Sequence, residues 1–250
     1  MSITRLKIGT YNLQHGVLHQ KRLETGEVTV DLAATAAVLR EHAPDICALN
    51  EIYGNEESTF GNQPRLLAEM LGYPYRAFAR GIYHKHGEYG NGLLSKYPIK
   101  AARVIPLVIP QEARPTGATR HYEDRALLVA TLDINGSTLT VMACHFGLND
   151  DEKALAVDTV LKEAAATDTP IVLLVDFNIT PDTVHYARLA AVFYDTAALC
   201  EGTPLTFPSN APCQKIDYVF TKGSIRAVGA TVPAIVASDH LPIFSDMELS

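Results

Sequence analysis

Short apolar runs recur along the chain, and polar or turn-forming residues separate them every few positions. Valine, isoleucine and leucine are frequent in these runs, and most runs are too short for a core helix. Short runs rich in β-branched residues are typical of strands. The pattern predicts strands at Leu6–Asn12, Ile46–Ile52, Leu93–Ser95, Val104–Val108, Ala126–Ile134, Thr138–His145, Ile171–Val175, Ile216–Phe220, Ile225–Val232 and Pro242–Leu249.

Between these strands lie windows in which apolar residues recur three or four positions apart, as on one face of a helix. Asp31 is a predicted N-cap, because its carboxylate can accept a free N–H of the first turn. Gly72 is predicted to end a helix, since glycine adopts the left-handed conformation at little cost. The predicted helices are Leu32–His42, Pro64–Leu71, Asp150–Ala166 and one that begins after Pro181 with Asp182 near its cap.

One pair of predicted strands is joined by a dipeptide that favours a tight turn. Asn135 and Gly136 separate Ala126–Ile134 from Thr138–His145, and this is the strongest hairpin signal in the chain. Antiparallel pairing is therefore expected, and a purely parallel doubly wound sheet is not. Many strands with few helices predict an α/β (α+β) fold of two packed sheets with helices outside. A length of 250 residues fits a single domain spanning residues 1–250.

Composition and charge narrow the choice of function. The formal net charge is −7, and the 21 lysines and arginines form no basic stripe, which disfavours tight non-specific DNA binding. The four cysteines lie far apart, so neither a structural zinc site nor a disulfide framework is expected. No apolar run approaches membrane-spanning length, and the chain enters a strand almost at once. We therefore expect a cytoplasmic protein with no transmembrane segment, and no protein partner is predicted.

Acids, amides and histidines stand at or near the ends of the apolar strands. A sheet holds its strand ends firmly, so side chains there are well placed to form an active site. Glu51 is the most informative, because a buried carboxylate without a partner costs on the order of several kcal/mol. Each of the others taken singly has an ordinary explanation as a cap, a turn residue or a buried histidine. The full set is Asn12, Glu51, His145, Asp176, Asn178, Asp217, Asp239 and His240.

This combination of side chains suits the hydrolysis of a phosphate ester. Carboxylate and amide oxygens are the ligands that Mg²⁺ and Mn²⁺ prefer, so one of these ions is the expected cofactor. A histidine can take a proton from an attacking water while an aspartate fixes its tautomer. Amide and imidazole donors can hold the phosphoryl oxygens as charge builds up on them.

Seven segments stand in an order that resembles the endonuclease/exonuclease/phosphatase superfamily, whose fold is called deoxyribonuclease I-like. They are TYNLQHG, LNEI, GEYGNGLLSKYPI, CHFGLND, VDFN, KIDYVF and SDHLPIF. Each is weak alone, but all seven occur in the family's order, and the match extends from about Lys7 to Leu249. The resemblance implies a four-layer sandwich of two mixed β-sheets flanked by helices, together with metal-dependent hydrolytic activity.

The resemblance also implies roles for the acids nearest the expected metal and base. Glu51 resembles the family's principal metal-ligating acid, with Asn12 beside it, and Asp239 resembles a carboxylate that supports the metal site. His240 resembles the general base, and Asp217 resembles the acid that orients it.

Further roles follow in the same way. Asp176 and Asn178 resemble the pair that handles the nucleophilic water and the phosphate. His145 resembles a histidine that stabilises the transition state or protonates the leaving group. Asn91 and Arg125 lie in segments that commonly line the substrate pocket, which makes them predicted substrate-binding residues.

Three positions depart from the family's common pattern. Asn50 stands where glutamine usually precedes the metal-ligating acid, and Val175 stands where glycine commonly precedes the DFN segment. Gln14 occupies a position that is histidine or aspartate in various relatives. None of the three removes a predicted ligand, but each changes the shape of the expected pocket.

The resemblance favours a small or membrane-derived phosphoester as the substrate, a phosphodiester in particular. CHFGLND is similar to the segment of bacterial small-substrate and sphingomyelinase-like members more than to that of abasic-site endonucleases. The acidic balance and the absence of tryptophan agree, since nuclease grooves commonly use aromatic or arginine wedges. Two alternatives stay open: a DNA-repair or general nuclease that binds nucleic acid, and a non-catalytic family member that acts as a binding protein.

Two segments outside this set are candidates for contact with an anionic substrate, and the role of each stays open. Arg80–Tyr89, which contains Lys85 between two histidines, is expected to be a loop overhanging the site. The long connection Pro110–Asp124 carries Arg114 and Arg120, and connections of this length are commonly functional. Histidines outside the main set are expected to be solvated or at the pocket edge: His15, His19, His84, His86, His121 and His185.

Overall fold

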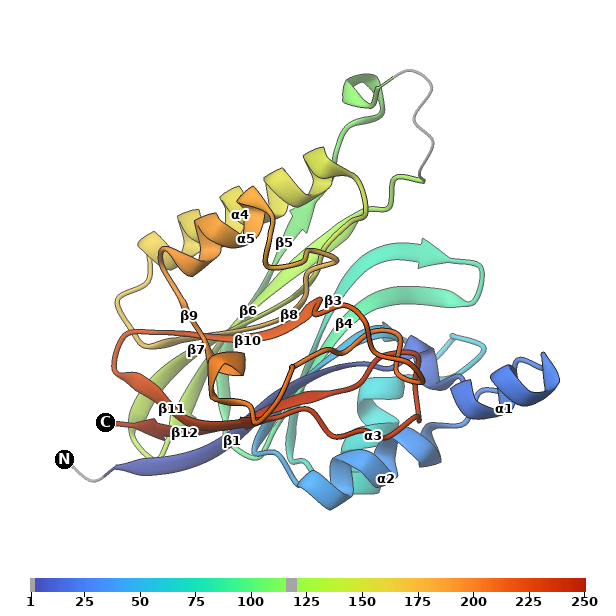
Figure 1. The fold of residues 1–250 in the computed structure, drawn as a ribbon, viewed down its shortest axis with the longest axis horizontal. Coiled ribbons are helices and arrows are strands. Elements are labelled where there is room, and N and C mark those ends of the chain that lie inside the picture. Colours follow the sequence, from blue (N-terminus) through green and yellow to red (C-terminus); the bar gives the residue numbers. More distant parts are fainter. Residues whose placement is uncertain (1–2, 116–120) are drawn as a thin grey trace.

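A computed structural model describes residues 3–115 and 121–250, and it contains two six-stranded sheets packed face to face (Figure 1). The first sheet consists of β1 (Thr4–Asn12), β2 (Ile46–Tyr53), β3 (Tyr75–His84), β4 (Gly87–Ser95), β11 (Ile225–Thr231) and β12 (Ile243–Leu249). Its strand order is β11-β12-β1-β2-β4-β3, in which β1 and β2 are parallel and the other neighbours antiparallel.

The second sheet is built in the same way around one parallel pair. Its strands are β5 (Ile99–Leu107), β6 (Arg125–Ile134), β7 (Ser137–His145), β8 (Ile171–Asp176), β9 (Tyr194–Asp195) and β10 (Asp217–Lys222). The order is β5-β6-β7-β8-β10-β9, with β7 and β8 parallel and the other pairs antiparallel. Both sheets are therefore mixed, as predicted.

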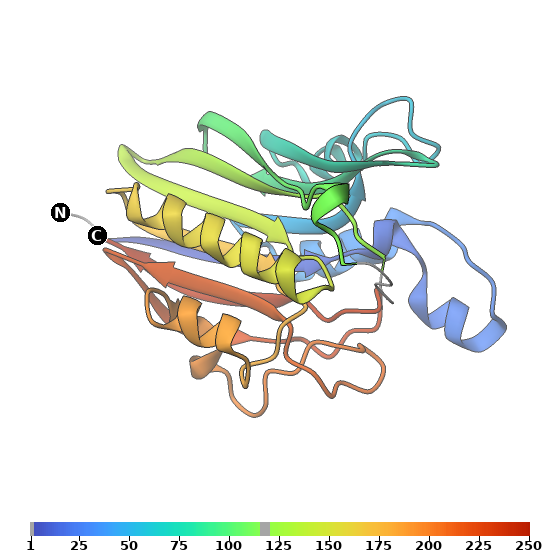
Figure 2. The same cartoon turned by 90° about the horizontal axis from the view of Figure 1, so that it is seen from above.

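Helices cover the outer face of each sheet and complete four layers (Figures 1 and 2). The α-helices are α1 (His19–Thr25), α2 (Leu32–His42), α3 (Gln63–Leu71), α4 (Asp150–Ala165) and α5 (Val184–Ala190), and single 3-10 turns lie at Gln14–Gly16, Gln111–Ala113 and Thr196–Leu199. Helices α2 and α3 pack on the first sheet, and α4 and α5 pack on the second. The predicted four-layer sandwich is confirmed. No helix in the described ranges is both long enough and apolar enough to cross a membrane.

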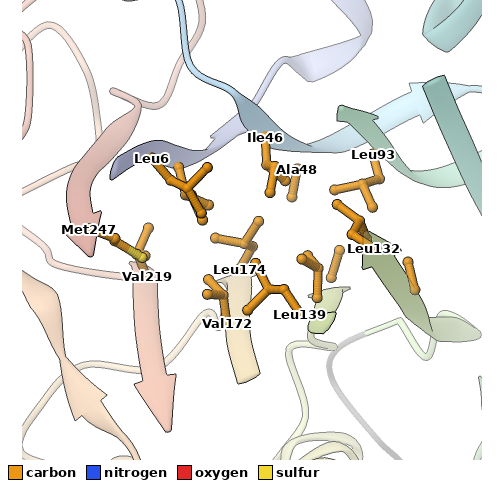
Figure 3. Close-up of a cluster of buried hydrophobic side chains, with 14 of the residues drawn as sticks. Leu6, Ile46, Ala48, Leu93, Leu132, Leu139, Val172, Leu174, Val219 and Met247 are labelled. Carbon is orange, nitrogen blue, oxygen red and sulfur yellow. The ribbon is translucent and has the colours of Figure 1, made fainter. Parts of the chain in front are cut away.

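Three apolar clusters hold the layers together. The central one fills the space between the two sheets with side chains that alternate along the strands (Figure 3). The other two lie between each sheet and its helices. Residues buried on both faces of the central strands explain the nearly continuous apolar runs in the sequence. The central cluster includes Leu6, Ile46, Ala48, Leu93, Leu132, Leu139, Val172, Leu174, Val219 and Met247.

The helix ends follow the capping signals. Asp31 accepts the N–H of Ala33, and Gly72 ends α3 in the left-handed conformation with φ 75°. The last predicted helix begins at Val184 and is capped by Thr183, directly after Asp182, which was predicted to lie near the cap. Thr183 is favoured because its hydroxyl lies at the position that accepts the N–H of Tyr186.

The parallel pairs place polar residues at one edge of the sandwich. In each sheet a helix joins the two parallel strands, as β1–α2–β2 and β7–α4–β8. At the carboxyl ends of these pairs, Asn12 lies beside Asn50, and His145 lies beside Asp176. Strand β10 begins at this edge with Asp217 opposite Asp176. The edge is at the opposite end of the sheets from the chain termini (Figure 1).

The region between β2 and β5 differs most from the sequence prediction. Only Leu93–Ser95 is predicted as strand, whereas β3 and β4 form a long hairpin. The predicted loop Arg80–Tyr89 is wrong, because it forms the end of that hairpin. Strand β3 is an edge strand with exposed or half-buried residues on both faces, and glycines interrupt β4, so neither shows an apolar alternation. Strand β5, also at an edge, begins at Ile99 instead of Val104 for the same reason.

Candidate active site

The polar strand-end residues predicted from the sequence lie in one network at this edge. Contacts of 3.8 Å or less connect them, and the network draws on strands of both sheets. Along the chain, the members of the network extend from Asn12 to His240. Asp239 is connected to the other members through Gln14. The members predicted from sequence are Asn12, Glu51, His145, Asp176, Asn178, Asp217, Asp239 and His240.

Glu51 owes its orientation to a β-bulge in β2. Leu49 pairs with Gly92 and Ile52 with Gly90, so two residues of β2 lie opposite one residue of β4. The extra residue lets Ile52 face the helices, as Leu49 does, and turns Glu51 out of the regular alternation. Glu51 has φ 59°, a left-handed conformation that costs energy for a residue with a side chain. Such strain is commonly found at functional sites.

The Glu51 carboxylate is held by two neutral donors. Asn12 donates from Nδ2 to Oε1 at 3.0 Å, and the Tyr89 hydroxyl donates to Oε2 at 2.9 Å. The same Asn12 nitrogen donates to Oδ2 of Asp176 at 2.9 Å. Asn12 thereby bridges the two sheets. Its own Oδ1 accepts the backbone N–H of Gln14.

Asp239 joins the network through Gln14, whose Nε2 donates to the Asp239 Oδ2 at 2.7 Å. Ser238 donates to the other carboxylate oxygen at 3.2 Å. Burial, together with the negative charge of Glu51, raises the pKa of Asp239 above its ordinary value. Asp239 and Glu51 are therefore close enough to repel each other.

Asp217, His240 and Asp176 form a buried group within the site. His240 Nδ1 lies 2.9 Å from Oδ2 of Asp217, and His240 Nε2 lies 3.8 Å from Oδ2 of Asp176. The ring of Phe207 packs on the His240 imidazole with 4.8 Å between ring centroids. Because the carboxylate accepts a hydrogen bond at Nδ1, the tautomer leaves Nε2 free to accept a proton. The contact brings the predicted base and its predicted orienting acid together, and their roles stay predictions.

Burial and neighbouring charges set the proton affinities of this group. Burial raises the pKa of Asp176 to about 7, and the nearby Asp217 carboxylate adds to the effect. Burial alone would lower the pKa of His240, but the carboxylates of Asp217 and Asp176 outweigh it and raise that pKa to about 10. The two carboxylates therefore favour the doubly protonated, positively charged form of the His240 ring.

His145 is buried between Arg125 and Asn178. Arg125 Nη1 lies 3.0 Å from His145 Nδ1, and Asn178 Nδ2 lies 3.0 Å from His145 Nε2. Asn178 follows β8 with φ 50°, and its N–H bonds to Oδ1 of Asp176. Asparagine tolerates this conformation better than most residues. Burial, followed by the charges of Arg125 and His240, holds the pKa of His145 well below its ordinary value.

Asn91 lies underneath the network instead of facing it. Its Oδ1 accepts from Asn50 at 3.0 Å, and its Nδ2 donates to the Ala126 carbonyl at 3.1 Å. Asn50 also donates to the Cys144 carbonyl at 2.9 Å, so it ties β2 to β7 across the sheets. Both ends of the Asn91 amide are thus engaged within the protein. Its substrate-binding role stays a prediction.

The donor set fits a hard divalent cation. Four carboxylates, those of Glu51, Asp176, Asp217 and Asp239, gather around the edge. Gln14 Oε1 and Asp217 Oδ1 are buried oxygens without a hydrogen-bond donor in the described structure. Excess negative charge and unpaired oxygen atoms are what Mg²⁺ or Mn²⁺ would neutralise and ligate.

Two places in the network offer ligands for such an ion. Asp176, Asp217 and His240 present ligand atoms that lie within 4.8 Å of one another. In that group, however, Asp217 and His240 already bond to each other. Glu51 is half-buried and has only neutral donors around its carboxylate. The Glu51 side, with Asp239, is therefore the better cation site.

The sequence did not point to two residues that contact the predicted ligands. Tyr89 bonds to Glu51 from the hairpin strand β4, and Gln14 bonds to Asp239. Gln14 stood out only as a departure from the family pattern. Tyr89 is half-buried among the rings of His15, Tyr53 and His84, so an aromatic cluster borders the Glu51 side.

Two histidines expected at the surface are buried. Nε2 of His185 donates to the Asp150 carboxylate on helix α4 at 2.8 Å, and His19 is buried at the start of α1. The prediction is wrong for both because each lies on a helix that the sequence pattern did not orient. Arg114 bonds to Asp124 and to a carbonyl within its own connection. Arg120 lies outside the described residues.

A surface hollow of about 630 Å³ lies far from this network. It is lined by Val192, Lys222 and Arg226, at the end of β10 opposite to Asp217. Its size makes it the kind of cavity that ligands occupy, but none of the strand-end residues reaches it. The hollow is therefore separate from the network of predicted site residues.

The chain is similar to known proteins in sequence and in fold. The model of the Endonuclease/Exonuclease/phosphatase family matches residues 9–240, which includes all the strand-end residues. The uncharacterized protein YbhP of Escherichia coli strain K12 is 24% identical over 238 residues, covering 84% of this chain and 86% of YbhP.

Two solved structures share the fold along nearly the whole chain. A Beutenbergia cavernae endonuclease/exonuclease/phosphatase is 25% identical, with a TM-score of 0.76 over 98% of this chain and 72% of that one. A mannosyl-6-phosphatase of Bacteroides thetaiotaomicron is 15% identical, with a TM-score of 0.75 over 97% of this chain and 99% of that one. At this identity the second comparison shows the fold alone.

Proposed function

The chain belongs to the endonuclease/exonuclease/phosphatase family, and we propose that it is a divalent-cation-dependent phosphoesterase that uses water to cleave a P–O bond. One observation carries the proposal. Asn12 donates hydrogen bonds to the half-buried carboxylate of Glu51 and to the buried carboxylate of Asp176. The hydrogen-bonded pair of His240 and Asp217 lies against Asp176 as well. Cation ligands and a proton acceptor therefore face one small volume.

The residues of the site have separate roles in the proposed reaction. His240 Nε2 accepts a proton from the attacking water, and Asp217 holds the ring through Nδ1 and stabilises the imidazolium. Asp176 and Asn178 orient the water and the phosphoryl group. The water oxygen forms the new bond to phosphorus as the bond to the leaving oxygen breaks. The leaving oxygen takes up a proton from solvent water, and His240 afterwards releases its proton to solvent.

Glu51 and Asp239, with Gln14 Oε1 beside them, are the proposed ligands of Mg²⁺ or Mn²⁺. When bound, the ion would neutralise charge on the phosphoryl oxygens and offset the carboxylates that raise the His240 pKa. Asn12 presents its amide nitrogen to Glu51, which suits it to orient that ligand.

The charge of the site favours a phosphodiester. A phosphomonoester carries two negative charges near neutral pH, whereas a diester carries one. The network contains four carboxylates, and the guanidinium of Arg125 is already paired with Glu123 at 3.0 Å. The singly charged ester is repelled less by such a site. The CHFGLND segment, His145 among its residues, further supports a small-substrate or sphingomyelinase-like relationship within the family.

A phosphomonoesterase is the second candidate. The observation in its favour is the shared fold of the Bacteroides mannosyl-6-phosphatase. A nuclease is less well supported, because the net charge of −7 gives no general attraction for a polyanion.

The test is hydrolysis of bis-p-nitrophenyl phosphate and p-nitrophenyl phosphate with Mg²⁺, with Mn²⁺ and with EDTA. We expect cation-dependent turnover that prefers the diester and disappears in EDTA. Faster turnover of the monoester would select the second candidate. Turnover that persists undiminished in EDTA would contradict the cation dependence, and binding of either ester without turnover would favour a non-catalytic role.

A further inference from the structure

The environment of His145 is unusual because hydrogen-bond donors face both of its ring nitrogens. Arg125 Nη1 lies 3.0 Å from Nδ1, and Asn178 Nδ2 lies 3.0 Å from Nε2. A neutral imidazole has one lone pair on one nitrogen and one proton on the other, so it can accept from only one of the two. The two contacts cannot both be hydrogen bonds.

The nature of the two donors decides which contact is kept. A guanidinium in a protein is always charged and has no lone pair to accept a proton, so Arg125 can only donate. A bond from a charged donor is about twice as strong as one between neutral groups. The Arg125 side chain is only 15% exposed, so water cannot easily replace its partner. Nδ1 of His145 is therefore the acceptor, and the proton lies on Nε2.

Asn178 cannot resolve the conflict by exchanging its amide oxygen and nitrogen. Its Nδ2 also donates to the Phe146 carbonyl at 3.0 Å. If the amide turned around, its oxygen would face that carbonyl oxygen, and two acceptors would oppose each other. The amide nitrogen therefore stays toward His145.

The result is two donors whose nitrogens lie 3.0 Å apart and which cannot bond to each other. His145 Nε2–H and the second Nδ2 proton of Asn178 point into the same space, and Oδ2 of Asp176 lies 3.5 Å from Nε2. One phosphoryl oxygen could accept from both donors. Paired donors aimed at a developing negative charge are a common means of stabilising a transition state.

We infer that Arg125 is a positioning residue that fixes His145 as the neutral tautomer with its proton on Nε2, so that His145 faces the phosphoryl group of the proposed site as a hydrogen-bond donor. The catalytic half of this inference rests on the proposed function, whereas the tautomer does not. His145 is then a hydrogen-bond donor and not the acid that protonates the leaving group. The depressed pKa of His145, caused by burial and by Arg125, agrees with a neutral ring.

Glu123 completes the arrangement. Its carboxylate oxygen Oε1 lies 3.0 Å from the same Nη1 atom and forms an ion pair with the guanidinium. This ion pair helps to hold the guanidinium against His145. Arg125 therefore acts through His145, which differs from the substrate contact predicted from the sequence.

The tautomer can be measured directly by NMR of ¹⁵N-labelled protein, because protonated and unprotonated imidazole nitrogens have well-separated shifts. The chain has nine histidines, and the His145→Gln variant identifies the signals of His145. In the wild type at pH 7, we expect Nε2 to be protonated and Nδ1 unprotonated. A proton on Nδ1, or on both nitrogens, would overturn the inference without any measurement of activity.

Variants at position 125 test the cause. Arg125→Met removes the donor, so Nε2 should become the acceptor of Asn178 and the proton should move to Nδ1. With Mg²⁺ and bis-p-nitrophenyl phosphate, kcat should fall about 10- to 100-fold with KM little changed, as for loss of a residue that orients a catalytic group. Arg125→Lys keeps a charged donor and should retain the wild-type tautomer and part of the lost activity.

Arg103→Met is the matched control, since Arg103 lies on the outer strand β5 and pairs with Glu163 at the surface. It should change neither the tautomer nor kcat. An unchanged tautomer in Arg125→Met, or a loss confined to KM, would show that Arg125 contacts the substrate and would refute the positioning role. If the wild type hydrolysed no ester, the proposed function would fail while the NMR result still decided the tautomer.

Discussion

In both the β1–α2–β2 unit and the β7–α4–β8 unit, a helix on the outer face of a sheet joins two parallel strands that end in polar residues. The first unit ends in Asn12 and Glu51, and the second ends in His145 and Asp176. In the first, a half-buried carboxylate is held by neutral donors. In the second, both side chains are buried, with exposed fractions of 4% for His145 and 1% for Asp176.

The difference between the units lies in their surroundings and not in their topology. Glu51 departs from the regular strand alternation through a bulge, and its side chain is only half-buried. Asp176 stays in the regular strand, where burial and Asp217 raise its pKa to about 7. One unit is thus suited to ligate metal, and the other to control the positions of protons.

The largest expected effect comes from His240, which lies 3.8 Å from Asp176 of the second unit. His240→Ala removes the proton acceptor, so kcat for bis-p-nitrophenyl phosphate should fall roughly 1,000-fold. The exposed His121 provides a control of the same kind, and His121→Ala should keep wild-type kcat. Circular dichroism would confirm that both variants fold. Near-wild-type turnover in folded His240→Ala would remove His240 from the mechanism.

Asp217→Asn should have the next largest effect, with kcat reduced about 100-fold, because the His240 ring loses the carboxylate that fixes its tautomer. The pH profile carries the sharper information. His240 must be deprotonated to act, so activity rises as pH increases through its pKa. The Asp217 carboxylate raises that pKa, so its neutralisation should move the rise to lower pH. A rise that stays in place or moves to higher pH would contradict this assignment.

Glu51→Gln tests the first unit. The amide keeps the shape but loses the charge, so the Mg²⁺ concentration for half-maximal activity should increase at least about tenfold. Glu41→Gln, on the exposed face of α2 in the same unit, is the matched control. An unchanged Mg²⁺ titration in Glu51→Gln would place the cation elsewhere, with the Asp176–Asp217–His240 group as the next candidate.

Tyr89→Phe should give the smallest effect. It removes one neutral hydrogen bond to Glu51, worth about 1 kcal/mol, which corresponds to roughly fivefold weaker Mg²⁺ activation. Tyr83→Phe, at an exposed position on the same hairpin, should leave the titration unchanged. Equal titrations for Tyr89→Phe and the wild type would mean that Asn12 alone orients Glu51.

Some features of the molecule follow from local sequence. The Asn135-Gly136 dipeptide specifies the β6–β7 hairpin, and Asp31 and Gly72 mark helix ends because their side chains or conformations act within a few residues. The candidate site residues could also be selected from the sequence, because an acid or a histidine directly after an apolar run is recognisable without knowledge of the fold. Their proposed roles remain to be tested.

Other features required the folded chain. The bulge that redirects Glu51 depends on pairing between β2 and β4, and the edge strand β3 has no alternation to reveal it. The donors around His145 come from Arg125 and Asn178, which are 20 and 33 residues away in sequence. Proton affinities and tautomers depend on burial and on charges within a few ångströms. Sequence therefore determined which groups are present, and only the tertiary structure decided their neighbours and protonation.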